Sequence, residues 1–261
     1  MRMRTIASLL ALSVSATAGA QQAASTATPA YTAAPAYITT AINDPERAAD
    51  SKDDARRQIA AVMAFTQVKP GDAVLELVPG SGYWTRVFSA IVGAAGHVYT
   101  IWPDEMGKFS TKSYAQWQSL VATPHYKNVS LLKEPAAHLG VPQKVDLVFT
   151  SQNYHDYHDP FMGPVDMGAF NKQVFDALKP GGVYVIIDHV APKGSGAADT
   201  DTLHRIDPML VKKEVEAAGF KFDGESDALR NPKDPHTVKV FDESIRGHTD
   251  QFIYRFRKPA G

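Results

Sequence analysis

The chain has 261 residues, of which 44% are hydrophobic and 21% charged, with 27 Lys and Arg against 28 Asp and Glu and no cysteine. This composition excludes a disordered or collagen-like chain and fits one globular domain or at most two. The near-neutral balance gives no overall attraction to nucleic acid or to an anionic membrane, so we expect no nucleic-acid partner. The absence of cysteine excludes disulfides, thiol catalysis and zinc sites built from cysteine.

The N-terminal residues predict export. Arg2 and Arg4 precede a short apolar run over residues 6–14, which ends in small residues with an A-x-A pattern before Gln21. These are the features of a signal peptide over residues 1–20, so we expect a periplasmic or secreted mature protein. The run is about half the roughly 20 residues that a membrane-spanning helix needs, and we therefore expect no stable membrane anchor after cleavage.

Residues 21–44 follow as a segment rich in Ala, Thr and Pro with hardly any charge. Such a segment buries too little apolar surface to offset its ordering entropy, so it is predicted to be flexible. Its last part carries Tyr37, Ile38 and Ile42, which can pack on a neighbouring domain. We assign residues 45–261 to the folded domain.

Strand and helix signals alternate over that domain. An amphipathic helix is predicted over residues 53–66, a buried strand over 73–78 and a second helix over 83–92. Further strands are predicted at 97–102, 129–132, 145–150, 183–189, 220–222 and 251–256, and helices at 114–122, 165–178 and 209–218. Alternation of this kind predicts an α/β fold with a Rossmann-like, doubly wound, mostly parallel sheet, closed by an antiparallel final strand.

The turn after the first strand is the candidate ligand site. Glycines at this place let a ligand approach the backbone closely, and the helix that follows directs its unpaired N–H groups there. Glu76 lies in an otherwise apolar strand near its C-terminal end, where ligands bind in open α/β sheets. Its carboxyl group is either a ligand partner or an acid paired with protein donors.

Residues 74–83, VLELVPGSGY, resemble the first motif of class I S-adenosylmethionine-dependent methyltransferases. Residues 146–149 resemble the family's fourth strand, residues 178–182 its turn into the fifth, and residues 216–220 its last helix and following strand. The resemblance covers roughly residues 53–257 and implies S-adenosylmethionine as cofactor. The residues that it implies in cofactor binding are Glu76, Pro79, Gly80, Ser81, Gly82, Tyr83, Trp102 and Asn153.

Two positions depart from the family pattern. Val78 stands where the family usually has a glycine, and Trp102 with Pro103 stands where it usually has an acid for the ribose hydroxyls. Trp102 either stacks on the adenine or fills a gap under the loop. More narrowly, residues 153–156 and 188–189, together with the export signal, resemble a group of predicted secreted bacterial methyltransferases.

His155 is the candidate catalytic base. It follows the fourth strand, its ordinary pKa near 6.5 suits proton removal at neutral pH, and Asp156 or Asp159 can orient its ring. Two alternatives stay open: a histidine of a surface loop, and a metal ligand together with His158 and Asp159. The histidine spacing is not that of a specific metal motif, so we predict no metal. Asp188 and His189 are further candidates for substrate contact.

The sequence thus predicts methyl transfer from S-adenosylmethionine to a small-molecule nucleophile, with His155 as base. The alternative is a secreted protein that retains the fold but binds another ligand, either without catalysis or with a metal. The segment 229–246 is either a cover over the site or an ordinary connection.

Overall fold

The structure is a computed structural model, and it describes residues 1, 34–108 and 111–261. The predicted signal peptide, apart from Met1, and residues 21–33 of the segment that follows it lie outside the described residues. Within the described ranges, no helix is long and apolar enough to cross a membrane.

One seven-stranded sheet organises residues 34–261, with strand order β3-β2-β1-β4-β5-β7-β6. Neighbouring strands are parallel except at β7, which is antiparallel to both β5 and β6. The mostly parallel sheet with an antiparallel final strand is therefore confirmed. The strands are β1 (Ala73–Leu77), β2 (His97–Pro103), β3 (Val129–Glu134), β4 (Val145–Ser151), β5 (Leu178–His189), β6 (Lys221–Ser226) and β7 (Gln251–Arg257).

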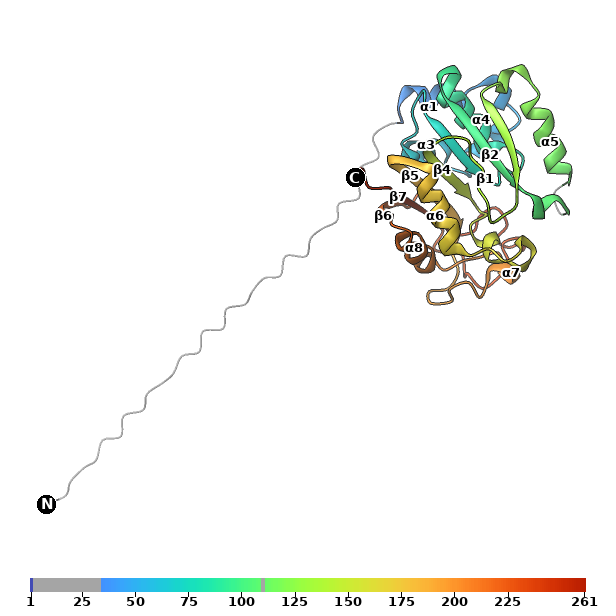
Figure 1. Cartoon of the computed structure of the whole chain (residues 1–261). Helices are drawn as coiled ribbons and strands as arrows, with labels where there is room; N and C mark the ends of the chain where they lie inside the picture. Colours follow the sequence, from blue (N-terminus) through green and yellow to red (C-terminus); the bar gives the residue numbers. More distant parts are fainter. Residues whose placement is uncertain (2–33, 109–110) are drawn as a thin grey trace. The chain divides into compact units, whose positions relative to one another are not determined.

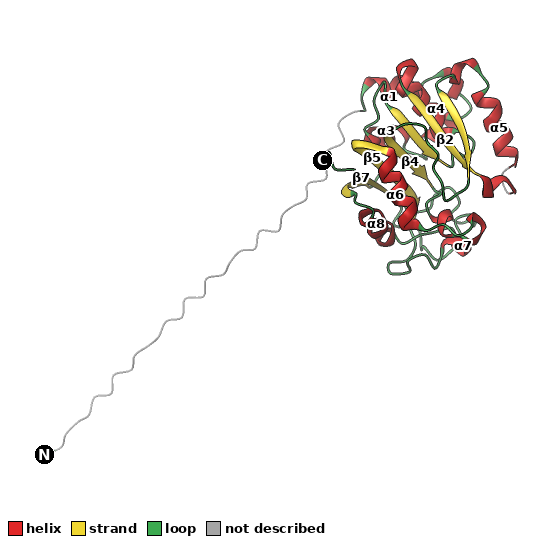
Figure 2. Cartoon of the chain, in the orientation of Figure 1, coloured by secondary structure: helices red, strands yellow, loops and turns green. Residues whose placement is uncertain are grey.

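Helices cover both faces of the sheet (Figures 1 and 2). Buried side chains of α1, α3, α4 and α5 form the core on one face, and those of α6 and α8 form the core on the other. The helices are α1 (Ala36–Ile42), α2 (Ser51–Asp54), α3 (Ile59–Thr66), α4 (Tyr83–Val92), α5 (Thr111–Val121), α6 (Met167–Ala177), α7 (Thr200–Leu203) and α8 (Pro208–Ala217).

Local sequence rules account for most of these elements. All five residues of β1 are buried, as expected for a central strand covered on both faces. Val74 packs into one core while Leu75 and Leu77 pack into the other, because successive side chains of a strand point to opposite faces. At the start of α8, the Asp207 carboxylate accepts a hydrogen bond from the Met209 backbone N–H at 2.9 Å.

The predicted helix over residues 53–66 is two helices instead. α2 ends at Asp54 and α3 begins at Ile59, and between them Gln58 adopts a left-handed conformation with φ 47°. An amphipathic pattern alone does not reveal a single left-handed residue. The break places the guanidinium of Arg57 4.4 Å from the centre of the Tyr83 ring, at the start of α4.

The strand order brings the ends of β1 and β4 together. From β1 the chain adds β2 and β3 on one side and then returns to place β4 on the other side of β1. A crevice opens at such a reversal, outside the C-terminal ends of the strands, and ligands of open α/β sheets bind there. The turn after β1 and the loop after β4 are therefore the two walls of the expected site.

Candidate active site

The turn from β1 into α4 runs over residues 78–82 and depends on its glycines. Gly80 and Gly82 both have positive φ, at 56° and 80°. A Cβ at Gly82 would lie 3.0 Å from the Trp117 ring, whereas a Cβ at Gly80 would meet nothing within 4 Å. Gly82 therefore permits close packing under the turn, and Gly80 leaves the space above it open.

Val78 takes up the backbone conformation of a glycine. Its φ is 51°, and its side chain is buried. A β-branched residue is a clear outlier in the left-handed region, and the strain costs about 1–3 kcal/mol. The departure from the family pattern at Val78 thus changes the side chain and keeps the turn.

A cavity of about 190 Å³ lies between this turn and the end of β4. It brings together six of the eight predicted cofactor residues with five others. Its lining consists of Arg57, Glu76, Val78, Pro79, Gly80, Ser81, Tyr83, Trp84, Ser151, Gln152 and Asn153. Gly82 caps α4 below the cavity. Trp102 is outside this lining: it is 1% exposed and packs edge-on against Tyr114, with 5.4 Å between ring centres.

Glu76 and Arg57 are the acidic and the basic side chain that line this cavity. The Glu76 carboxyl is buried and accepts a hydrogen bond from the Thr85 hydroxyl of α4. Burial raises the pKa of Glu76 to about 8, which the Thr85 hydrogen bond only partly offsets. The Nε of Arg57 is buried and has no hydrogen-bond partner among the described residues. Arg57 was absent from the sequence-based candidates, because the break between α2 and α3 directs it here.

A second cavity, of about 390 Å³, adjoins the first and shares Gln152 and Asn153 with it. Gln152 follows β4 with φ 64°, a left-handed turn that places these two side chains between the cavities. The lining comprises Met106, Gln152, Asn153, His155, Asp156, Phe161, His189, His204, Val240 and Phe241.

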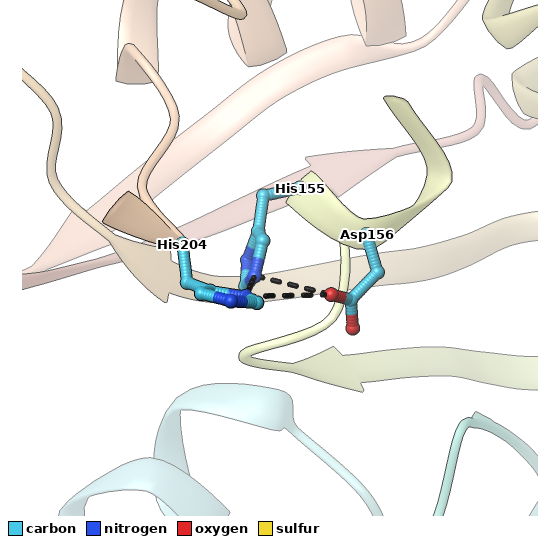
Figure 3. A group of neighbouring side chains, drawn as sticks. All are labelled: His155, Asp156 and His204. Carbon is cyan, nitrogen blue, oxygen red and sulfur yellow. Dashed lines mark hydrogen bonds and ion pairs between the residues drawn. The ribbon is translucent and has the colours of Figure 1, made fainter. Parts of the chain in front are cut away.

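His155 contacts three polar side chains at the second cavity. It begins a 3-10 turn, η5 (His155–His158), and its Nδ1 lies 2.8 Å from Oδ1 of Asp188, the penultimate residue of β5. Its Nε2 lies 3.2 Å from Asp156 Oδ1 and 3.3 Å from His204 Nδ1 (Figure 3). Asp188 thus holds Nδ1 of the ring and the predicted Asp156 contacts Nε2, while neither contact involves the other predicted partner, Asp159.

The protonation state of His155 differs from the expected one. Burial alone would lower its pKa, but the adjacent Asp188 and Asp156 carboxylates outweigh burial and raise the pKa to about 10. His155 is therefore protonated at neutral pH in this structure. The two carboxylates therefore favour the protonated ring, and the role of His155 as catalytic base stays a prediction. His189, by contrast, has its pKa lowered to about 4 by burial and stays neutral.

His204 was absent from the sequence-based candidates. It follows α7, far from His155 in the chain, with no motif around it. A parallel bridge between Val190 and Ile206 extends the end of β5 and brings His204 to His155. His158 points elsewhere, with Nε2 3.3 Å from Glu214 Oε2. Among the described residues, the three possible metal ligands that converge are His155, Asp156 and His204.

The segment 229–246 covers the second cavity, which is one of its two predicted roles. Val240 and Phe241 form part of the cavity wall, and the Val240 backbone N–H donates to the Leu203 carbonyl at 3.2 Å. Arg205 holds the segment through two hydrogen bonds to the Asp234 carboxylate, at 2.9 and 3.0 Å, in a pair that is fully buried.

A family model described as Protein-L-isoaspartate(D-aspartate) O-methyltransferase matches residues 27–141 of the chain. A protein-L-isoaspartate O-methyltransferase of Methanosarcina mazei is 29% identical over 133 residues, which are 51% of this chain and 47% of that protein. The chain therefore spans about half the length of this curated relative.

Solved structures share the fold over most of the chain. A SAM-dependent methyltransferase from Aquifex aeolicus covers 84% of this chain and 96% of its own, with a TM-score of 0.52 and 20% identity. The [4+2]-cyclase SpnF covers 79% of this chain and 81% of its own, with a TM-score of 0.56 and 17% identity. The fold is thus that of the class I S-adenosylmethionine-dependent methyltransferases. S-adenosylmethionine, the cofactor expected from the sequence, is the cofactor that the matched family and fold support.

Proposed function

We propose that this protein is a methyltransferase that uses S-adenosylmethionine and holds its acceptor in the second cavity. The observation that carries the proposal is the shared wall. Gln152 and Asn153 border both the cavity beside the glycine turn and the cavity that contains His155. A donor in one and an acceptor in the other would meet at this wall, as an in-line transfer requires.

The charged residues of the first cavity fit the amino-acid end of the cofactor. S-adenosylmethionine supplies an electrophilic methyl group on its sulfonium and carries an ammonium and a carboxylate at that end. Glu76 offers a carboxyl group for the ammonium, and Arg57 offers a buried Nε that lacks a partner among the described residues. Residues 79–83 and Asn153 complete the proposed cofactor contacts, whereas Trp102 is packed against Tyr114.

For the acceptor, we propose a small molecule. The second cavity, at about 390 Å³, is within the range of small-ligand pockets and is covered by Val240 and Phe241. His155 and Asp156 are the polar groups that we expect to contact the acceptor. The family model and the Methanosarcina mazei relative favour a second candidate, an isoaspartyl carboxylate of a damaged protein.

Export is part of the same proposal. The N-terminal pattern of two arginines, a short apolar run and an A-x-A site supports cleavage after residue 20. N-terminal sequencing of protein recovered from outside the cytoplasm would start at Gln21 if this is correct. A mature N-terminus at Met1 would contradict it.

Calorimetric titration of the folded protein with S-adenosylmethionine tests the function. We expect binding by the natural chain, loss of binding in Glu76→Ala, and retained binding without turnover in His155→Ala. Transfer of labelled methyl groups, measured on isoaspartyl peptides and on small-molecule extracts, then separates the two acceptor classes. If the folded protein shows no heat of binding at high micromolar concentrations of the cofactor, the proposal is wrong.

A further inference from the structure

Three possible metal-ligand atoms converge at one point of the second cavity. The separations are 3.2 Å between His155 Nε2 and Asp156 Oδ1, 3.3 Å between His155 Nε2 and His204 Nδ1, and 4.0 Å between His204 Nδ1 and Asp156 Oδ1. A point equidistant from the three atoms in their plane lies about 2.1 Å from each, the length of zinc bonds to nitrogen and oxygen. The three side chains come from two separate segments and turn toward one another (Figure 3).

The groups behind these ligands have the arrangement found around bound metals. A metal-binding histidine donates its other ring N–H to a carboxylate or carbonyl, which fixes its tautomer and orientation. His155 Nδ1 lies 2.8 Å from Asp188 Oδ1, and Asp188 is fully buried. Asp156 is supported in the same way, because its second oxygen accepts a hydrogen bond from Asn153 Nδ2 at 3.2 Å.

A proton is a poorer occupant of this point than a metal ion. The N–H bond of His155 Nε2 points in one direction, so it can form a well-aligned hydrogen bond with Asp156 or with His204 but not with both. A cation at the centre would interact with all three atoms. It would also balance Asp156 and Asp188, two buried carboxylates beside one ring.

We propose that His155, Asp156 and His204 bind a divalent transition-metal ion, whose remaining coordination positions face the second cavity. Two imidazoles and one carboxylate suit zinc, iron, cobalt or nickel rather than magnesium or calcium. Three protein ligands with an open position are the arrangement of catalytic rather than structural zinc sites. All three ligands line the cavity, so a molecule bound there has access to the ion.

The expected ligand of the open position is an acceptor with a hydroxyl or thiol group, a part of the inference that rests on the proposed methyl transfer. A metal ion stabilises the deprotonated form of a bound oxygen or sulfur. The acceptor proton would pass to solvent, and the acceptor oxygen or sulfur would form its bond to the methyl carbon while the bond from that carbon to the sulfonium sulfur breaks, which leaves the demethylated cofactor.

Titration of the chelator-treated, tag-free protein with Zn²⁺ tests the site, with Co²⁺ as a probe whose visible absorption reports its ligands. We expect one ion per chain, and binding weakened about 100-fold or more in His204→Asn and in Asp156→Asn. Asparagine tolerates the left-handed φ of 54° at position 204, so this variant retains the backbone. His138→Ala is the matched control, because His138 is largely exposed and contacts Glu134.

The outcomes separate the site from the proposed function. If the natural protein takes up no zinc or cobalt, or if His204→Asn and Asp156→Asn bind as well as His138→Ala, the site is wrong. Titration with S-adenosylmethionine on the same samples shows independently whether the cofactor binds. Methyl transfer that is unchanged by chelation and by His204→Asn would overturn the role of the ion toward the acceptor, and would leave the proposed function standing.

Discussion

Glu76 is a carboxyl group that is almost completely buried, although a charged carboxylate is far more stable in water than in a protein interior. The Thr85 hydroxyl is its hydrogen-bond donor, and the Arg57 guanidinium borders the same cavity. Burial therefore dominates and keeps the group protonated near neutral pH in the free protein. A cationic ligand beside it would favour the charged form, so Glu76 is a site where ligand binding and proton release are coupled.

The buried carboxyl predicts a pH-dependent stability. The pKa of Glu76 is about 8 in the folded chain against an ordinary 4.5, so its stabilising effect is complete below pH 4.5 and is lost as the pH rises to 8. Glu76→Gln retains a neutral side chain at every pH. Relative to the natural protein, the variant should gain up to about 1.4 kcal/mol of unfolding free energy per pH unit across that window.

Urea unfolding at pH 5 and pH 8 measures this difference. Glu243→Gln provides the control, because Glu243 is exposed and its substitution should give no pH-dependent difference. An equal offset between Glu76→Gln and the natural chain at both pH values would contradict the prediction.

The segment 229–246 contributes Val240 and Phe241 to the wall of the second cavity. The buried pair of Arg205 and Asp234 ties it to the stretch that carries His204, and Asp234 also accepts a hydrogen bond from the Asp250 backbone N–H at 2.7 Å. This ion pair anchors the segment, and Val240 and Phe241 are thereby held against the cavity. The same anchor fixes His204, whose ring packs on Phe241 with 5.0 Å between centres.

Removing one partner of this anchor should destabilise the fold. Asp234→Ala leaves the buried Arg205 charge unpaired, which costs about 3–5 kcal/mol of unfolding free energy. The double variant Arg205→Met with Asp234→Leu should recover part of that loss, because neither charge remains to be desolvated while the Asp250 backbone N–H still loses its acceptor. Chemical denaturation of both variants measures the effect, with exposed Lys233→Ala as control. A double variant as unstable as Asp234→Ala would show that the charge itself does not carry the stability.

The elements of the sheet and the site residues that follow β1 and β4 could be predicted from the sequence, whereas Arg57 and His204 could not. The apolar run of β1, the glycine turn and the helix from Tyr83 to Val92 are local features, so their residue types define them. The bridge between Val190 and Ile206 brings His204 to the second cavity. The left-handed conformation of Gln58 directs Arg57 to the first cavity. Such placements depend on tertiary packing, which no local pattern records. The pKa of His155 depends in the same way on Asp188, a neighbour only in the fold.

At the scale of the whole molecule, the helix before the predicted domain boundary belongs to the folded body. α1 places Ile38 and Ala41 in the core that α3 and α4 share, and the Tyr37 hydroxyl donates to the Val68 carbonyl at 3.1 Å. The Ala, Thr and Pro content of residues 21–44 places the folded domain at residues 45–261, but the sequence also predicts that Tyr37, Ile38 and Ile42 pack on that domain. Burial of Ile38 and Ala41, rather than average composition, decides where the packed structure begins.

Shortening the chain tests this boundary. A protein that begins at Ala34 should be about 3 kcal/mol more stable than one that begins at Asn43, because the second lacks the buried Ile38 and Ala41. Thermal and urea unfolding of the two proteins give the difference directly. Equal stabilities would mean that α1 contributes nothing to the core.

The wall formed by Gln152 and Asn153 has a thermodynamic consequence for any pair of ligands in the two cavities. The Asn153 amide also donates a hydrogen bond to the Asp156 carboxylate, so a ligand in the first cavity that moves this amide changes the position of a carboxylate in the second. Linkage then requires reciprocity: whatever factor one ligand imposes on the affinity of the other is returned unchanged. The affinities for the methyl donor and the acceptor would then depend on each other. A demethylated donor that stays bound would change the affinity for the next acceptor.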